Sequence, residues 1–203
     1  MTILLVRHGE TALNVTRVLQ PPDTPLGERG RHQAAAVARR VAALAPAALL
    51  ASDLPRAWQT AQALADASAL PIEASPLLHE RNFGDWRGRA WTDVDADPFT
   101  LQEAPPGGES MAAFEQRVAA AWAQVQARRA QLAGPLVVIT HGLLIHRLLS
   151  AHAALAPGTV LPRQLDNASL TVLDAAPPHA MTLMGCTRHL DDLPPTVHPA
   201  QPR

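Results

Sequence analysis

The pattern of apolar and polar residues changes from segment to segment along the chain. Short apolar runs, which predict strands, alternate with longer segments of helical spacing. Thr2 to Val6 is a short apolar run with no room for a helix before polar residues 7–11, which predicts a buried strand that ends in a loop. Helical spacing follows from Gly27 to Leu44, and Ala48 to Ala51 is again strand-like. The apolar stripe of this first helix comprises Ala34, Val37, Val41 and Leu44.

The same alternation continues to the C-terminal part of the chain. The further predicted elements are a helix over Leu54 to Ala67, a short strand around Ile72, a long helix from about Ser110, a strand over Leu136 to Ile139, a helix through Leu149, and strands over Leu170 to Leu173 and Met181 to Met184. Strands that alternate with helices favour an α/β fold. We expect a three-layer α/β/α sandwich with a mainly parallel central sheet.

One segment interrupts this rhythm. Residues 81–108 are rich in glycine and proline, which predicts an irregular, lid-like insertion. The proline-rich stretch 193–203 predicts a C-terminal tail without regular structure. No internal repeat is visible, so we expect residues 1–192 to form a single domain.

Composition and charge exclude several classes of function. A net charge of -1 provides no broad cationic field, so we expect neither nucleic acid nor a membrane surface as a partner. Apolar runs are strand-length and no charged leader precedes the first one, which predicts a cytoplasmic protein. With Cys186 as the single cysteine, a multi-cysteine zinc site is excluded. The 17 basic residues are all arginine, so arginine must bind any anion.

Two polar clusters each follow an apolar strand directly. They are Arg7-His8-Gly9 and Thr140-His141-Gly142. In an open α/β sheet both clusters would face the crevice at the carboxyl ends of the strands, where ligands bind. A histidine at a strand end is by itself more often structural than catalytic. Two histidines and an arginine at one edge, however, predict an anion site that can also do nucleophilic chemistry.

Further short motifs surround these two clusters along the chain. The set comprises Arg7 to Thr11, Asn14, Thr24 to Gly30, Gln33-Ala34, Ser52 to Ala57, Gln59 to Ala61, Glu80, Phe83 to Trp86, Gly107 to Ser110 and Thr140 to Gly142. With these motifs the chain resembles the histidine phosphatase superfamily, also called the phosphoglycerate mutase-like family. They stand in the order of the family from the first strand to at least residue 149.

The resemblance implies a role for six residues. It makes His8 the nucleophile, Glu80 the proton donor, and Arg7, Arg56, His141 and Asn14 the groups that hold the phosphoryl group, with His141 a further donor if it is protonated. The field of two arginines should keep His8 neutral by disfavouring its imidazolium. Since no histidine pair with a carboxylate partner is spaced for a metal on a helix, we expect no metal and no cofactor.

The implied activity is a metal-independent phosphatase that hydrolyses a small phosphorylated metabolite through a phosphohistidine. One alternative is a cofactor-dependent phosphoglycerate mutase, but mutases that resemble this family carry a longer insertion after the glutamate, and residues 83–88 are more similar to the phosphatase branch. A second alternative is a non-catalytic module that binds a phospho-ligand, which would need neither His8 nor Glu80.

The substrate and the oligomeric state stay open at this point, with a homodimer as one option. Three residues depart from the family pattern at positions that bear on substrate choice, namely Leu13, Pro21 and Arg87, the last of which replaces a common acidic residue.

Overall fold

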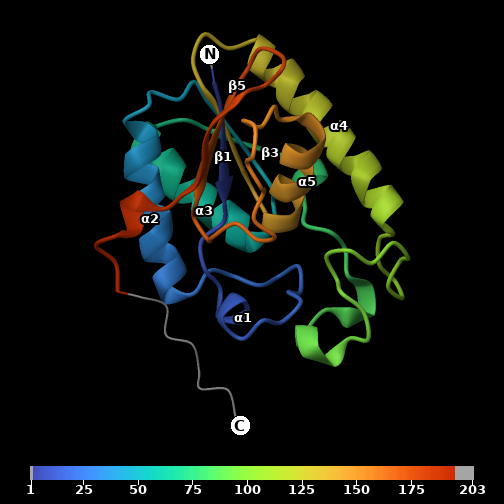
Figure 1. Cartoon of the computed structure of the whole chain (residues 1–203). Coiled ribbons are helices and arrows are strands. Elements are labelled where there is room, and N and C mark those ends of the chain that lie inside the picture. The colour runs from blue at the N-terminus through green and yellow to red at the C-terminus, as the bar shows by residue number, and fades with distance from the viewer. Residues whose placement is uncertain (1, 195–203) are drawn as a thin grey trace.

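The centre of the molecule is a six-stranded sheet, described in a computed structural model that covers residues 2–194 (Figure 1). The strands lie in the order β3-β2-β4-β1-β5-β6. The first four pair in parallel, whereas β5 is antiparallel to β1 and β6 to β5. The strands are β1 Thr2–Arg7, β2 Ala48–Ala51, β3 Ile72–Ala74, β4 Leu136–Thr140, β5 Leu170–Asp174 and β6 Met181–Cys186. The predicted mainly parallel sheet is confirmed.

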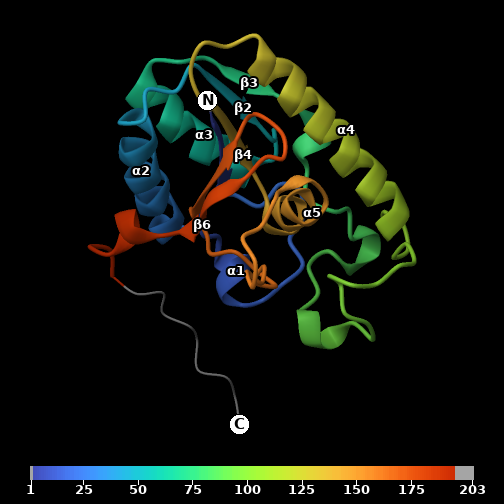
Figure 2. The same cartoon turned by 45° about the horizontal axis from the view of Figure 1, so that its top comes forward.

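Helices cover both faces of this sheet, as Figure 2 shows, with α2 and α3 on one side and α4 and α5 on the other. The helices are α1 Ala12–Val15, α2 Glu28–Ala42, α3 Pro55–Ser68, α4 Met111–Ala130 and α5 Gly142–His152, and the 3₁₀ turns are η1 Pro76–Leu78, η2 Gly84–Trp86, η3 Trp91–Asp93 and η4 Arg188–Leu190. The three-layer α/β/α prediction is confirmed. Within residues 2–194, no helix is both long and apolar enough to cross a bilayer.

Successive residues of the central strands belong to opposite layers of the core. In β1, Ile3 and Leu5 pack in the cluster that contains α4 and α5, whereas Leu4 and Val6 pack in the cluster that contains α2 and α3. All four side chains are at most 1% exposed. Side chains alternate between the two faces of a strand, so a strand covered on both faces must be apolar throughout. This is why β1 is an unbroken apolar run.

The structure corrects one predicted helix and adds another. Helix α2 ends at Ala42 rather than Leu44, and Leu44 is 44% exposed, so its predicted place in the buried stripe is wrong. The chain turns away there because Ala45 takes a positive φ of 49°. Helix α1 was not predicted, because four residues are too few for a periodic signal. Most of the predicted tail lies outside the described residues, in 195–203.

Two glycines allow the loop after β1 to lie against the first turn of α2. A Cβ atom on Gly9 would come within 2.4 Å of the Gly30 carbonyl oxygen, and one on Gly30 within 1.9 Å of the Glu10 carbonyl oxygen. No larger residue fits at either position without a shift of backbone. The residue that follows β1, His8, therefore has its main chain held close to α2.

We predict that Gly30→Ala lowers the free energy of unfolding by about 1–3 kcal/mol through overpacking. This is opposite in sign to the gain of about 1 kcal/mol that alanine normally brings to a helix interior. Gly27→Ala is the matched control, since a Cβ there meets the Glu10 carbonyl oxygen at an ordinary 3.5 Å. Urea unfolding of both variants measures the difference. Equal stability of the two variants would contradict the close approach.

Candidate active site

The two predicted histidines lie side by side at the carboxyl edge of the sheet. Strands β1 and β4 are parallel neighbours with Arg7 opposite Thr140, so His8 and His141 follow at the same level. The His8 amide donates to the Thr140 carbonyl at 2.9 Å, and the two imidazole centroids are 5.2 Å apart. The prediction that both clusters share one crevice is confirmed.

Hydrogen bonds from three different elements hold the loop that starts at His8. The Gly9 amide donates to Thr60 Oγ1 of α3 at 3.0 Å, and the Glu10 amide donates to Gln33 Oε1 of α2 at 2.8 Å. From the turn before β5, Asn167 Nδ2 donates to the His8 carbonyl at 3.0 Å. The position of the His8 backbone is thus determined by tertiary contacts with three segments that are distant in the sequence.

The His8 imidazole is arranged as a neutral base. Its Nδ1 lies 2.8 Å from the Gly9 carbonyl, which can only accept, so we assign the hydrogen to Nδ1 and the lone pair to Nε2. Burial, then the positive charges of Arg56 and Arg7, lower the pKa of His8 well below 6.5. The predicted effect of the two arginines on the pKa of His8 is present, but burial is the larger cause. An unprotonated Nε2 is the form of histidine that acts as a nucleophile.

Arg7 and Arg56 bring two buried cations next to His8, with 5% and 3% of each residue exposed. Arg7 Nη1 donates to the Leu165 carbonyl, and Arg56 Nη1 lies 3.4 Å from the Pro21 carbonyl. Desolvation by burial lowers the pKa of each to about 10, so both stay charged at neutral pH. Among residues 2–194, no carboxylate lies within ion-pair distance of either. Such a pair favours binding of an external anion.

Glu80 is partly buried and lies against the first turn of α5. Its Oε2 accepts from the Leu143 amide and its Oε1 from the Arg81 amide, each at 3.0 Å. Amides in the first turn of a helix favour a negative charge beside them. The backbone of Glu80 is also held, because Arg117 Nη2 donates to its carbonyl at 3.2 Å and Arg117 Nη1 donates to the His79 carbonyl at 2.7 Å.

His141 is fully buried, and its Nε2 lies 2.8 Å from Ser52 Oγ. Its Nδ1 has no hydrogen-bond partner in the part of the chain that the structure describes. Burial, then the charge of Arg56 and the neighbouring His8, lower the pKa of His141 well below 6.5. The option of a protonated His141 is therefore disfavoured. A neutral imidazole can still donate from one nitrogen if Ser52 donates to the other.

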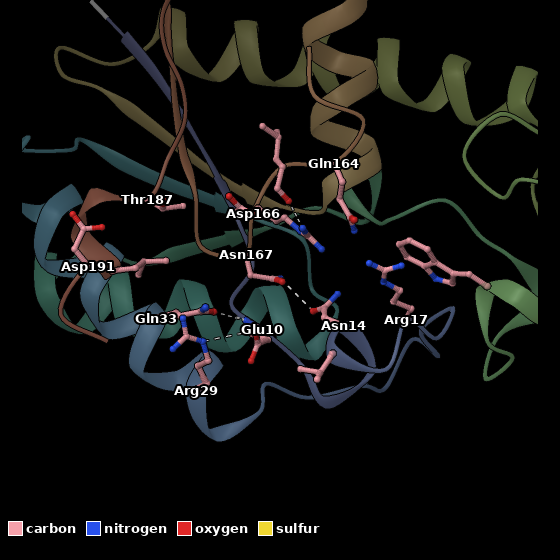
Figure 3. Close-up of a pocket in the computed structure, with 15 residues that line it drawn as sticks. Glu10, Asn14, Arg17, Arg29, Gln33, Gln164, Asp166, Asn167, Thr187 and Asp191 are labelled. Carbon is pink, nitrogen blue, oxygen red and sulfur yellow. Dashed lines mark hydrogen bonds and ion pairs between the residues drawn. The ribbon is translucent and has the colours of Figure 1, made fainter. Parts of the chain in front are cut away.

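Asn14 lies between two cavities beside Arg7. Its Oδ1 accepts from the Thr11 amide at 3.0 Å and from Asn167 Nδ2 at 3.2 Å. Figure 3 shows Asn14 and Asn167 pointing toward one another across the mouth of a cavity of about 450 Å³, hereafter the side cavity. The amide group of Asn14 is thus held by the same residue that donates to the His8 carbonyl.

Five of the six predicted residues line one small cavity of about 60 Å³, hereafter the inner cavity. These residues are Arg7, His8, Asn14, Arg56 and Glu80, and the His141 ring lies next to the His8 ring. By this measure a cavity needs roughly 10–15 Å³ to hold one water molecule, so the inner cavity has room for a group of several heavy atoms such as a phosphoryl group. The structure brings the six residues together, while their chemical roles stay predictions.

Sequence reasoning gave no role to several residues that support this site. Ser52 bonds to His141, Asn167 bonds to Asn14 and to the His8 carbonyl, and Arg117 bonds to the backbone around Glu80. Ser52 stood within a segment of the resemblance, but nothing in the sequence paired it with a residue 89 positions away. Contacts of this kind have no local sequence signal.

The residues around the inner cavity form a site for an oxyanion next to an unprotonated imidazole nitrogen. The family model described as "Histidine phosphatase superfamily (branch 1)" matches residues 3–184. The chain belongs to this superfamily. The predicted resemblance is confirmed, and with it the assignment to an enzyme superfamily.

Named relatives fall on both the phosphatase and the mutase side of the family. A glucosyl-3-phosphoglycerate phosphatase of Mycobacterium tuberculosis is 34% identical over 164 residues, which is 73% of this chain and 74% of the relative. A probable phosphoglycerate mutase GpmB of Yersinia enterocolitica is 33% identical and covers 94% of this chain and 95% of its own. The solved structure of YhfR from Bacillus stearothermophilus aligns with a TM-score of 0.79 at 28% identity, covering 94% of this chain and 99% of that one.

We predict that the free energy of unfolding falls as the pH drops below about 6.5. His8 and His141 have lowered pKa values in the folded state, so in this window the unfolded chain binds protons that the folded chain does not. The folded chain therefore has its full stability above about pH 6.5, and it loses stability below that pH because the two histidines bind protons in the unfolded chain. Each contributes a slope of up to about 1.4 kcal/mol per pH unit.

Urea titrations between about pH 7 and pH 5 measure this slope. His8→Gln and His141→Gln should each make the slope shallower by removing one of the two groups. If neither variant differs from the natural chain in slope, the two histidines titrate alike in the folded and unfolded states, and the assigned pKa directions are wrong.

Proposed function

We propose that this chain is a metal-independent phosphatase that transfers the phosphoryl group of a small phosphomonoester to His8 and then to water. The observation that carries the proposal is the neutral His8, with a bare Nε2, beside two buried arginines that have no carboxylate partner among residues 2–194. The phosphatase name of a 34% identical relative supports it.

The first chemical step transfers the phosphoryl group to the enzyme. His8 Nε2 attacks phosphorus as the ester P–O bond breaks, and Arg7 and Arg56 stabilise charge on the non-bridging oxygens. Glu80, protonated at this stage, gives its proton to the leaving oxygen, so the alcohol departs neutral. His141 donates from Nδ1 to the same phosphoryl group, with Ser52 donating to Nε2.

The second step returns the enzyme to its starting state. Water attacks the phosphorus of phosphohistidine as the P–N bond breaks, and Glu80, now ionised, accepts a proton from that water. The products are inorganic phosphate and neutral His8 with a protonated Glu80. No side-chain cluster suited to a metal occurs among residues 2–194, and in this proposal Arg7, Arg56 and His141 supply the electrostatic stabilisation of the phosphoryl group.

A phosphoglycerate mutase is the second candidate, because relatives named as probable mutases cover almost the whole chain. In a mutase the phosphohistidine transfers its phosphoryl group to a sugar acid rather than to water. Incubation with 3-phosphoglycerate and a trace of 2,3-bisphosphoglycerate distinguishes the two. Release of inorganic phosphate supports the phosphatase, and formation of 2-phosphoglycerate without phosphate release supports the mutase.

We predict that turnover passes through an acid-labile, base-stable phosphohistidine at His8. Rapid quenching with a labelled substrate in the presence of EDTA, followed by peptide mapping, locates the label. His8→Ala should form no phosphoenzyme, while His32→Ala, an exposed position on α2, is the control that keeps it. Label on another residue, or loss of labelling with EDTA and its return with magnesium or zinc, would contradict the proposal.

We predict that Glu80→Gln slows the first step by ~10²–10⁴ for an alkyl phosphate and far less for p-nitrophenyl phosphate. The alkoxide of an alkyl ester needs a proton as it leaves, whereas p-nitrophenolate departs as an anion. Single-turnover phosphorylation of His8 is the measurement, because in steady state Glu80 also acts as a base for water with either substrate. Equal slowing of both substrates would mean that Glu80 positions the phosphate and that another group is the acid.

A further inference from the structure

An arginine outside the machinery described so far borders the inner cavity. Arg87 follows η2, is half-buried, and lines both the inner cavity and a neighbouring cavity of about 630 Å³, hereafter the outer cavity. No hydrogen bond or ion pair to its guanidinium occurs among residues 2–194. Its one described electrostatic neighbour, Arg56, carries the same charge.

Every other polar side chain that lines the outer cavity already has a partner within the described chain. The pairs are His79 with Asp53, Glu80 with the Leu143 and Arg81 amides, Asn82 with the Gly84 amide, Ser110 with the Ala113 amide, and Glu109 with Arg117. Both carboxylates at the cavity are therefore occupied by other groups. Arg87 alone among these lining residues presents an unpaired charge.

The proposed chemistry directs the alcohol part of the substrate toward Arg87. His8 lines the inner cavity but not the outer one, whereas Glu80 lines both. In an in-line displacement the leaving oxygen lies opposite the nucleophile, next to the acid that protonates it. The leaving group then extends past Glu80 into the outer cavity. The side cavity of Figure 3 also adjoins Arg7 but is not lined by Glu80.

The charged side chains that line the inner cavity leave one cation over, while Asp166, which lines the side cavity, acts on Arg7 from there. A phosphomonoester dianion balances Arg7 and Arg56, and Glu80 is neutral when it acts as an acid. Arg81 is satisfied by three backbone carbonyls and Arg163 by Asp97. Arg87 remains without a counter-charge in a partly desolvated place, where a planar guanidinium pairs well with a carboxylate or a phosphate.

We propose that Arg87 binds a second oxyanion, carried on the alcohol part of the substrate and seated in the outer cavity. This inference rests on the proposed function and narrows it: the preferred substrates are phosphomonoesters that also carry a carboxylate or a second phosphate. Alkyl phosphates with an uncharged alcohol part place their phosphoryl group in the inner cavity equally well, but offer Arg87 no counter-charge.

Matched substrate pairs test the assignment. 3-Phosphoglycerate and glycerol 3-phosphate differ in a carboxylate, and fructose 1,6-bisphosphate and fructose 6-phosphate differ in a second phosphate. For the pair with the right anion, we expect kcat/KM to favour the doubly anionic member by roughly 10- to 150-fold, which corresponds to a charged hydrogen bond worth about 1.5–3 kcal/mol. The pair that shows the preference identifies which oxyanion the cavity takes.

Substitutions then assign that preference to Arg87. Arg87→Ala should reduce the ratio of kcat/KM within the pair to about threefold or less, and Arg87→Lys should keep part of it. Arg89→Ala is the matched control, since Arg89 is exposed, donates to the Asp93 carbonyl and lines neither cavity, so the ratio should stay as in the natural chain. Circular dichroism and thermal unfolding establish that each variant is folded.

Failure of this inference is distinguishable from failure of the proposed function. Hydrolysis of both members of each pair at similar kcat/KM, unchanged by Arg87→Ala, would overturn the role of Arg87 and leave the phosphatase in place. If the folded chain hydrolyses none of these substrates, their binding can still be measured by calorimetry. The same pairs are titrated into the His8→Ala variant with and without Arg87→Ala, and the Kd values test the role of Arg87. Equal Kd values with and without Arg87 would overturn the inference, and a tenfold or greater weakening confined to the doubly anionic member would support it.

Discussion

The parallel pairing of β1 with β4 is the constraint on which the site depends. It sets Arg7 opposite Thr140 and so brings His8 and His141, 133 positions apart in the chain, to the same edge with their rings 5.2 Å apart. A slip of one residue in this register would turn the apolar side chains of β1 to the opposite layers of the core, so packing on both faces protects the alignment of the histidines.

Burial gives this site its chemistry and also makes it costly to fold. Two arginines and two histidines with lowered pKa values lie together in a place shielded from water. Desolvation is the largest cause of all four lowered pKa values. Backbone carbonyls offset part of the cost by accepting from Arg7 and Arg56, and the rest is carried by the core on either side of the sheet. An oxyanion that binds there would relieve the repulsion between the two cations.

The segment that carries Glu80 and Arg87 depends on arginines of a different kind. Arg81 donates to the carbonyls of Pro98, Glu103 and Glu109, and Arg117 to those that surround Glu80. These side chains serve as internal supports for a stretch that has no regular structure beyond 3₁₀ turns. The irregular composition of 81–108 thus coexists with a defined position for Glu80. That these residues move as a lid stays a prediction.

The sequence by itself determined which segments of the chain form the strands and the longer helices, because hydrophobic periodicity is local. It also determined the class of fold and the six residues of the candidate site, because the motifs stand in the order of the family. The tertiary structure alone decided how these residues act on one another: the tautomer of His8, the lowered pKa of His141, the contact of Ser52 with His141, and the position of Arg87 between two cavities. Each of these depends on burial and on partners distant in the chain, and neither leaves a trace in local sequence. The same holds for Leu44, which was predicted in the buried stripe of the helix but lies beyond the end of α2 and is exposed, next to a turn at Ala45.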